Sequence, residues 1–159
     1  MSPDLTSARV PERTSDDHAR GEGREAIVYM DLACPHCAAI WARIERLPLS
    51  LVFRHFPVAS KHPRAPALHA AAEAVALEGG EPAFWALVDS IYRDQGRIDD
   101  PHLWDRARGL DLDVERFDAD RRTPQVAARV RRDFESGIRA GVAGTPAAFL
   151  DGHLVKDVW

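Results

Sequence analysis

The sequence predicts an α/β protein, and three stretches of the chain carry this prediction. Residues 26–30 are a short apolar run rich in β-branched and aromatic side chains, which is typical of a buried strand. Apolar residues then recur at helical spacing over 35–47. Near the other end of the chain, apolar residues 147–150 precede Asp151-Gly152, a pair typical of a tight hairpin turn. A strand, a helix and a later hairpin on one chain indicate an α/β architecture.

The segment between these stretches has the pattern of a second strand followed by a helical block. Residues 49–56 are rich in strand-forming side chains, and Pro57 ends the run. In the block, apolar side chains recur every three or four residues, so they are most simply core positions. The last helix places Val126, Val130, Phe134 and Ile138 on one side. We expect helices over 66–78, 82–91, 100–109, 113–117 and 124–138.

The only two cysteines lie together, in Cys34-Pro35-His36-Cys37, between the first strand and the first helix. Pro35 suits a first helical position, so Cys34 lies at the helix N-terminus, where free N–H groups and the helix dipole favour a thiolate. Cys37 lies one turn further in, more covered, and suits the resolution of a mixed disulfide. His36 is a second possible source of positive charge that lowers the pKa of Cys34. Redox exchange is therefore the leading interpretation.

The cysteine pair has two other interpretations. A buried structural pair conflicts with the exposed position of a helix start. A zinc site needs four ligands as a rule, and the sequence holds no second cysteine pair, so we expect no metal. Five further histidines show no paired ligand spacing; they are His55, His62, His69, His102 and His153.

A second motif lies far downstream, where Thr145-Pro146 stands at the entrance to the strand at 147–150. Together with the cysteine motif it resembles the thioredoxin superfamily, and within it the DsbA-like thiol-disulfide oxidoreductases. The Pro-His dipeptide between the cysteines is the one associated with the oxidising DsbA type. The resemblance runs from about Ala26 to Val158 and rests on residues 29–37, on Arg54-His55-Phe56-Pro57 and on residues 141–146.

The resemblance implies a thioredoxin-like fold with an inserted helical domain at about 62–140. It also implies that Cys34 and Cys37 are catalytic, that Pro35 and His36 tune their pKa values, and that Thr145 and a cis-Pro146 bind the substrate. The expected partner is a thiol- or disulfide-bearing protein or a small thiol, with no cofactor. Val28 stands where relatives often carry a buried acid. The alternative function is a non-catalytic binding domain or a glutathione-conjugating relative.

Composition favours one globular unit. The chain has 159 residues, of which 45% are hydrophobic and 29% charged, and it lacks the run of about 18 apolar residues of a membrane span. A net charge of −4 and a pI near 6.0 argue against a nucleic-acid partner. Acidic residues interrupt the arginine cluster, which favours a solvated helix face. The cluster comprises Arg121, Arg122, Arg129, Arg131 and Arg132.

The two ends of the chain carry separate expectations. Residues 1–24 are polar, so we expect a disordered tail before a domain at 25–159. The tail has no apolar run of a secretory signal, which favours a cytoplasmic protein, or an extracytoplasmic one if a leader was removed. Relatives continue beyond the position of Trp159 into a helix that covers one face of the sheet. We therefore expect an apolar face around Val155, Val158 and Trp159 and a homodimer.

Overall fold

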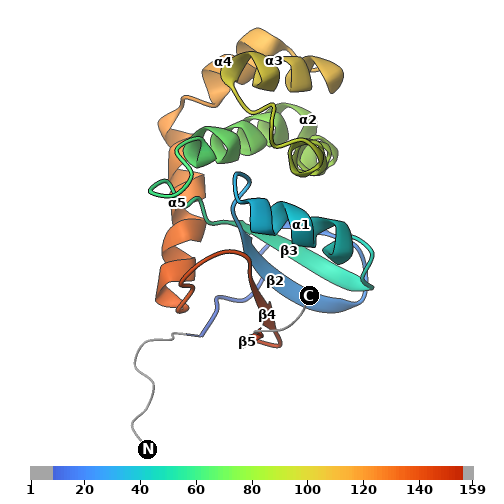
Figure 1. Cartoon of the computed structure of the whole chain (residues 1–159), viewed down its shortest axis with the longest axis vertical. Helices are drawn as coiled ribbons and strands as arrows, with labels where there is room; N and C mark the ends of the chain where they lie inside the picture. Colours follow the sequence, from blue (N-terminus) through green and yellow to red (C-terminus); the bar gives the residue numbers. More distant parts are fainter. Residues whose placement is uncertain (1–8, 156–159) are drawn as a thin grey trace, which may run out of the picture.

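The apolar run of the first predicted strand lies within β2 (Arg24–Met30), the central strand of a five-stranded sheet in the computed structural model (Figure 1). The structure describes residues 9–155. The strand order is β1-β3-β2-β4-β5; β2 and β3 are parallel, and the other neighbours are antiparallel. The remaining strands are β1 (His18–Arg20), β3 (Leu49–His55), β4 (Ala147–Leu150) and β5 (His153–Val155).

Helix α1 (Pro35–Ile44) connects the parallel pair β2 and β3, as a crossover must. Pro35 occupies its first turn, as predicted. Between β3 and β4 lie α2 (Ala65–Arg93), α3 (Asp100–Gly109), α4 (Val114–Asp120) and α5 (Pro124–Arg139). The two helices expected over 66–78 and 82–91 both lie within α2, and a kink separates them at Gly80, where the backbone is non-helical with φ 69° and ψ −164°.

Two of the predicted helix starts are formed by the side chains that the sequence indicated. Asp113 accepts a hydrogen bond from the backbone N–H of Arg116 and caps α4. Thr123 accepts one from the N–H of Val126 and caps α5. Because side chains close in the sequence fix these two helix boundaries, the boundaries could be predicted from the sequence. Within the described residues, no helix has both the length and the apolar character that a membrane crossing requires.

Alternate residues of β2 face two different cores. Ala26, Val28 and Met30 pack under α1 and α2, with Phe53 of β3 in the same core. On the opposite face, Ile27 and Tyr29 join a smaller core. Figure 1 shows α1 on one face of the sheet with α2, α3 and α4 beyond it, and α5 running past the end of the sheet.

The expectation of a disordered tail over residues 1–24 is wrong for the residues from 9 onward. Residues 18–20 form strand β1, which pairs with β3. Asp17 forms an ion pair with Arg54, and Arg20 forms one with Asp89. The polar composition of this segment suggested disorder. In the structure, however, its charged side chains form ion pairs with residues of β3 and α2, which lie far along the chain. Residues 1–8 lie outside the described part.

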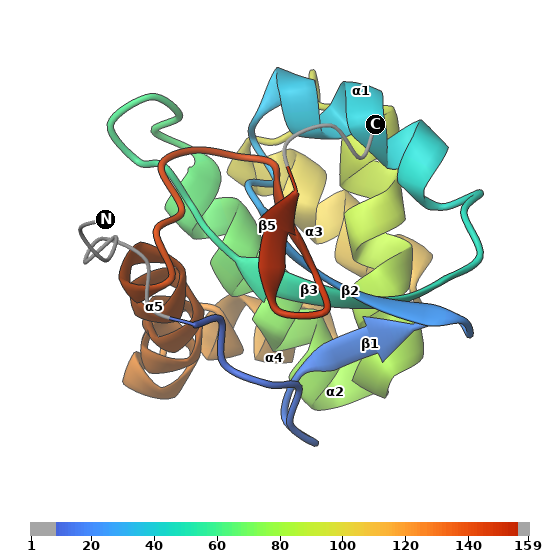
Figure 2. The ribbon, with the colours of Figure 1, turned by 90° about the horizontal axis from the view of Figure 1, so that it is seen from below.

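The expectation of a bare apolar face is also wrong for the described residues. Ile27, Val52 and Phe149 on that face are buried, because Val10, Phe56 and the end of α5 pack against them. Figure 2 shows the segment that precedes β1 passing close to α5 on this side. Val155 is partly buried, and Val158 and Trp159 lie outside the described residues. The homodimer stays a prediction without this support.

Helix α5 departs from its predicted faces at two positions. Val126 and Val130 are buried, but Ile138 is 53% exposed, because Ser136 and Gly137 are the residues of the last turn that face the core. The arginine cluster is not only a solvated face. Arg129 forms ion pairs with Glu73 and Asp133 at 3.2 and 2.7 Å, and both of these carboxylates are buried.

Candidate active site

Cys34 is the N-cap of α1, with extended backbone angles of φ −79° and ψ 120°. Its Sγ accepts a hydrogen bond from the backbone N–H of Cys37 at 3.4 Å. This is the position of a capping oxygen, so the unpaired N–H groups of the first turn point at the sulfur. Cys34 is 7% exposed and Cys37 is fully buried, and both are free thiols.

The structure brings the second motif against the first, across 111 positions of sequence. The Cys34 sulfur lies 4.0 Å from the backbone carbonyl oxygen of Thr145. The Thr145–Pro146 peptide bond is cis, and Pro146 directly precedes β4. The four residues Cys34, Cys37, Thr145 and Pro146 therefore form one cluster, at the start of α1 and the entrance to β4.

The surroundings of Cys34 lower its pKa to about 5. The largest cause is the hydrogen bond from the thiol of Cys37, and the backbone N–H groups of Cys37 and His36 and the side chain of Thr145 act in the same direction. Partial burial opposes them. His36 thus acts on the sulfur through its backbone, while its side chain is exposed. Above a pH of about 5, Cys34 is therefore a thiolate.

Cys37 has the opposite character, with a pKa raised far above its ordinary value. The largest cause is that its thiol donates to Cys34, and burial adds to this. One proton is thus shared by the two sulfurs and resides on Cys37. The pair consists of one reactive thiolate at the rim of the site and one protected thiol behind it.

We expect brief alkylation of the reduced protein at mildly acidic pH to modify Cys34 first. The reason is that only the thiolate is nucleophilic, and Cys34 alone is ionised there. Peptide mass mapping after quenching measures the order. Preferential labelling of Cys37 would contradict the assignment.

A family model described as the DsbA-like thioredoxin domain matches residues 55–159. The chain belongs to the DsbA-like thioredoxin family. Cys34 and Cys37 precede the matched residues, so the cysteine motif and the family match are independent observations. The resemblance first noted in the motifs is confirmed for the family and for the α/β thioredoxin-like fold.

Solved structures agree on the fold of this DsbA-like domain. BdbD from Bacillus subtilis has a TM-score of 0.79 at 16% identity, covering 97% of this chain and 90% of that one. DsbA2 from Pseudomonas aeruginosa has a TM-score of 0.71 at 22% identity, covering 91% and 87%. The thiol-disulfide exchange protein alpha-DsbA2 from Wolbachia pipientis has a TM-score of 0.73 at 19% identity, covering 95% and 79%.

Curated relatives with higher identity are much longer proteins. The Na(+)/H(+) antiporter NhaA of Herminiimonas arsenicoxydans is 35% identical over 149 residues, which are 88% of this chain and 23% of that protein. NhaA 1 of Salinispora arenicola is 34% identical over 162 residues, with 96% and 24% covered. The chain therefore spans about a quarter of the length of these relatives.

Side chains outside the predicted site residues hold the cysteine loop of this DsbA-like domain in place. The Asp31 carboxylate, fully buried, accepts from the backbone N–H groups of Ala33 and Val58. The Tyr92 hydroxyl donates to the Asp31 carbonyl at 3.0 Å. Gln95 donates to the carbonyls of Leu32 and Cys34, at 2.9 and 3.1 Å. Tyr92 lies at the end of α2 and Gln95 in the loop after it. Both are far from the cysteines in the sequence, so no local spacing indicates that they contact the cysteine loop.

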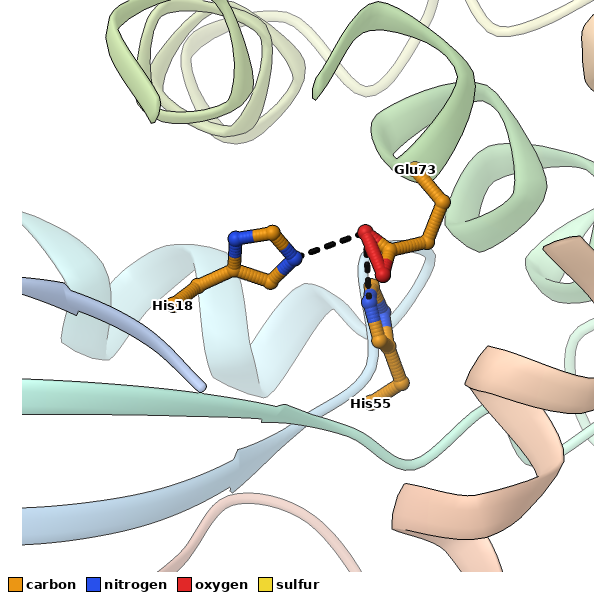
Figure 3. A group of neighbouring side chains, drawn as sticks. All are labelled: His18, His55 and Glu73. Carbon is orange, nitrogen blue, oxygen red and sulfur yellow. Dashed lines mark hydrogen bonds and ion pairs between the residues drawn. The ribbon is translucent and has the colours of Figure 1, made fainter. Parts of the chain in front are cut away.

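A buried group of side chains also escaped the sequence analysis. Figure 3 shows His18 of β1, His55 of β3 and Glu73 of α2 pointing toward one another. Their ligand-type atoms all lie within 4.8 Å of each other. A metal would need a lone pair on the Nε2 atom of each imidazole. Whether the donor set fits a metal therefore depends on where the ring protons lie.

The hydrogen-bond network decides the tautomers. The N–H of Leu32 donates to His69 Nε2 at 3.0 Å, so neutral His69 carries its proton on Nδ1. That proton is donated to His55 Nδ1 at 2.7 Å, which leaves the His55 proton on Nε2, facing Glu73. Burial lowers the pKa of His69 to about 4, so it is neutral. In addition, the Arg129 guanidinium lies 3.2 Å from Glu73. The donor set does not fit a metal.

The contribution of His18 and Glu73 to the stability of the fold should be largest in mildly acidic solution. His18 donates to Glu73 and Glu81, which raise its pKa although burial opposes them; Glu73 has a lowered pKa for the reciprocal reason. The contribution of His18 is complete below its unfolded pKa of about 6.5 and is lost as pH rises through its folded pKa. That of Glu73 is complete above about 4.5 and is lost on acidification.

Urea unfolding across pH tests this prediction. The difference in unfolding free energy between the wild type and His18→Gln should be largest between pH 4.5 and 6.5, which are the ordinary pKa values of the two side chains. A difference that grows steadily up to alkaline pH would contradict it.

Proposed function

We propose that this domain is a thiol–disulfide oxidoreductase that exchanges disulfides with protein or small thiol substrates through the dithiol Cys34–Cys37. One observation carries the proposal. Cys34 is placed at a helix N-terminus with its sulfur facing N–H groups, and Cys37 lies behind it as a buried, protonated thiol. The DsbA-like family and fold indicate the same class of protein. The geometry supports a nucleophile and a resolving thiol rather than a structural pair.

Exchange proceeds in two displacements. In the first, the Cys34 thiolate attacks a disulfide R–S–S–R, forms a mixed disulfide Cys34–S–S–R and expels one RS⁻. In the second, Cys37 loses its proton and attacks the Cys34 sulfur, which closes the Cys34–Cys37 disulfide and expels the second RS⁻. The protein loses two electrons and the substrate disulfide gains them. The reverse sequence oxidises a substrate dithiol.

Thr145 and Pro146 are the substrate-binding residues of the proposal. The Thr145 carbonyl lies 4.0 Å from the Cys34 sulfur, so a substrate segment bonded to Cys34 passes beside this backbone. An extended segment can hydrogen-bond to such a backbone in the manner of an added strand. Pro35 fixes the first turn of α1, and the backbone N–H of His36 supports the thiolate.

Equilibration in glutathione redox buffers tests the function. The protein is incubated over a range of ratios of reduced to oxidised glutathione, acid-quenched and alkylated, and the fraction of Cys34–Cys37 disulfide is measured by mass. We expect one transition with two-electron dependence, whose midpoint gives the reduction potential and thereby the favoured direction. A protein that forms no internal disulfide at any ratio would support the alternative, a non-catalytic binding domain or a glutathione-conjugating relative.

A further inference from the structure

A groove between the first turns of α2 and the length of α5 has no part in the exchange steps above. Its volume is about 970 Å³, within the range of small-molecule sites in proteins. Figure 1 shows the start of α2 beside α5. The groove ends at Ala143, two positions before Thr145, but none of the four residues of the cysteine cluster lines it. It is therefore distinct from the exchange site.

One wall of the groove is a stripe of α5 that faces away from the core. It runs from Thr123 through Ala127 and Phe134 to Ile138, a length of about 22 Å at the helical rise per residue. Phe134 stacks on Phe56 in the floor, with ring centroids 4.6 Å apart. Ala127 and Ile138 are exposed. Apolar surface that is left open in a groove of this size is typical of a binding site for an elongated apolar group.

The charges along the groove have one sign, because its lining includes three arginines and no carboxylate. Arg121 is already paired, at 3.3 Å with Asp100 and at 2.7 Å with Asp118. Arg122 is 59% exposed and makes only a 3.5 Å contact with the same Asp118. Arg131 is exposed and forms no ion pair within residues 9–155. Arg122 and Arg131 can therefore receive an anion from outside the protein.

The cationic and apolar parts lie toward opposite ends of the groove. Arg122 precedes α5, and Arg131 serves the same end, because long side chains of a helix lean toward its N-terminus. Ile138 and Ala143 line the other end. A hydrocarbon chain fits the distance, since one leaflet of acyl chains in a bilayer is about 15 Å thick. A peptide would instead bring backbone N–H and C=O groups against the apolar stripe without hydrogen-bond partners.

We propose that the groove between α2 and α5 binds a long-chain carboxylate. The carboxylate accepts hydrogen bonds from the guanidinium groups of Arg122 and Arg131. The hydrocarbon chain lies along α5 as far as Ile138 and covers Phe56 and Phe134. The ligand is held by charge at one end and by the burial of apolar surface along the rest. This binding is independent of the disulfide exchange proposed above.

The test is titration of the full chain with cis-parinaric acid, a long-chain carboxylate whose fluorescence rises in an apolar site. We expect one saturable site per chain with a dissociation constant below about 100 µM. Palmitate should displace the probe. Methyl palmitate should bind about tenfold more weakly or worse, because it has no charge for the arginines. Octanoate should also bind more weakly, because its shorter chain buries fewer methylene groups.

Two pairs of matched variants locate the site. Arg131→Glu should weaken palmitate binding by about tenfold or more, because it sets a like charge against the carboxylate. Arg132→Glu changes the next residue, which is 53% exposed and lies outside the groove, and should stay within about twofold of the wild type. Ile138→Glu should also weaken binding by about tenfold or more. Leu47→Glu is its control, because Leu47 is 41% exposed elsewhere on the surface.

Each other result has a defined meaning. The proposal is overturned if no saturable site is found, if palmitate and its methyl ester bind equally, or if Arg131→Glu and Arg132→Glu have equal effects. If Ile138→Glu does not fold, Ala127→Glu replaces it, and unchanged binding then overturns the proposal. It is also overturned if palmitate does not bind and Ile138→Glu instead slows reduction of a peptide disulfide or dissociates a dimer. Cys34→Ser should bind palmitate like the wild type, which separates this site from the exchange activity.

Discussion

Cys34→Ser is expected to reduce disulfide exchange by at least about 1,000-fold, because the only ionised sulfur of the site is removed. Cys37 cannot take over the attack, since it is fully buried and its pKa is raised. Reduction of a peptide disulfide by the reduced protein, under one set of redox conditions, measures the loss. Circular dichroism of the variant should match that of the wild type, because serine also caps a helix.

Cys37→Ala is the matched variant and should fail at the other step. Cys34 still attacks, although more slowly at acidic pH, because the largest cause of its lowered pKa is gone. The mixed disulfide then accumulates, since no thiol is left to resolve it. Mass analysis should find glutathione bonded to Cys34 in this variant and none in Cys34→Ser. Full activity of Cys34→Ser in a cellular or binding assay would favour the non-catalytic alternative.

Arg54→Met is expected to destabilise the fold by about 3–5 kcal/mol, the largest stability effect of the substitutions considered. The guanidinium donates to the Asp17 carboxylate at 3.0 and 3.1 Å, and to the Tyr29 hydroxyl and the Glu12 carbonyl at 3.1 Å each. The side chains of Arg54 and Asp17 are 4% and 5% exposed. Methionine fills much of the volume but leaves a buried carboxylate without its partner.

Urea unfolding followed by tryptophan fluorescence measures this loss. Arg24→Met is the control, because Arg24 forms an ion pair with Asp151 whose side chains are 58% and 69% exposed. Such exposed pairs contribute at most about 1 kcal/mol, so the control should stay within that range. Asp17→Asn combined with Arg54→Met should recover part of the stability, because the buried charge is then absent. Equal effects of Arg54→Met and Arg24→Met would contradict the argument.

The features that the sequence predicted correctly depend on neighbours in the chain. The strand at 26–30, the first-turn Pro35 and the caps Asp113 and Thr123 are set by periodicity and by side chains within one helical turn. The placement of Cys34 at the start of α1 belongs to the same class, since it follows from Pro35 and the helical pattern after it. For these elements tertiary packing and local preference agree.

The features that were missed depend on partners far away in the sequence. His18 meets Glu73 across 55 positions, and Asp17 meets Arg54 across 37, so a polar stretch that resembled a tail is part of the fold. His55 and His69 lie 14 positions apart on different elements. No spacing rule indicates that they touch. Tyr92 and Gln95 support the cysteine loop through backbone carbonyls, a contact that leaves no pattern in the sequence.

The distance of 111 positions between Cys34 and Thr145 has a consequence for the newly made chain. At ribosomal rates of about 5–20 residues per second, both thiols are synthesised on the order of 10 s before the segment that covers them. The central strand β2 must also wait for β4, its neighbour on one side, until almost the whole domain has been synthesised. During that interval the dithiol is open to chance disulfides with other nascent chains. A domain of this topology therefore completes its cysteine site last.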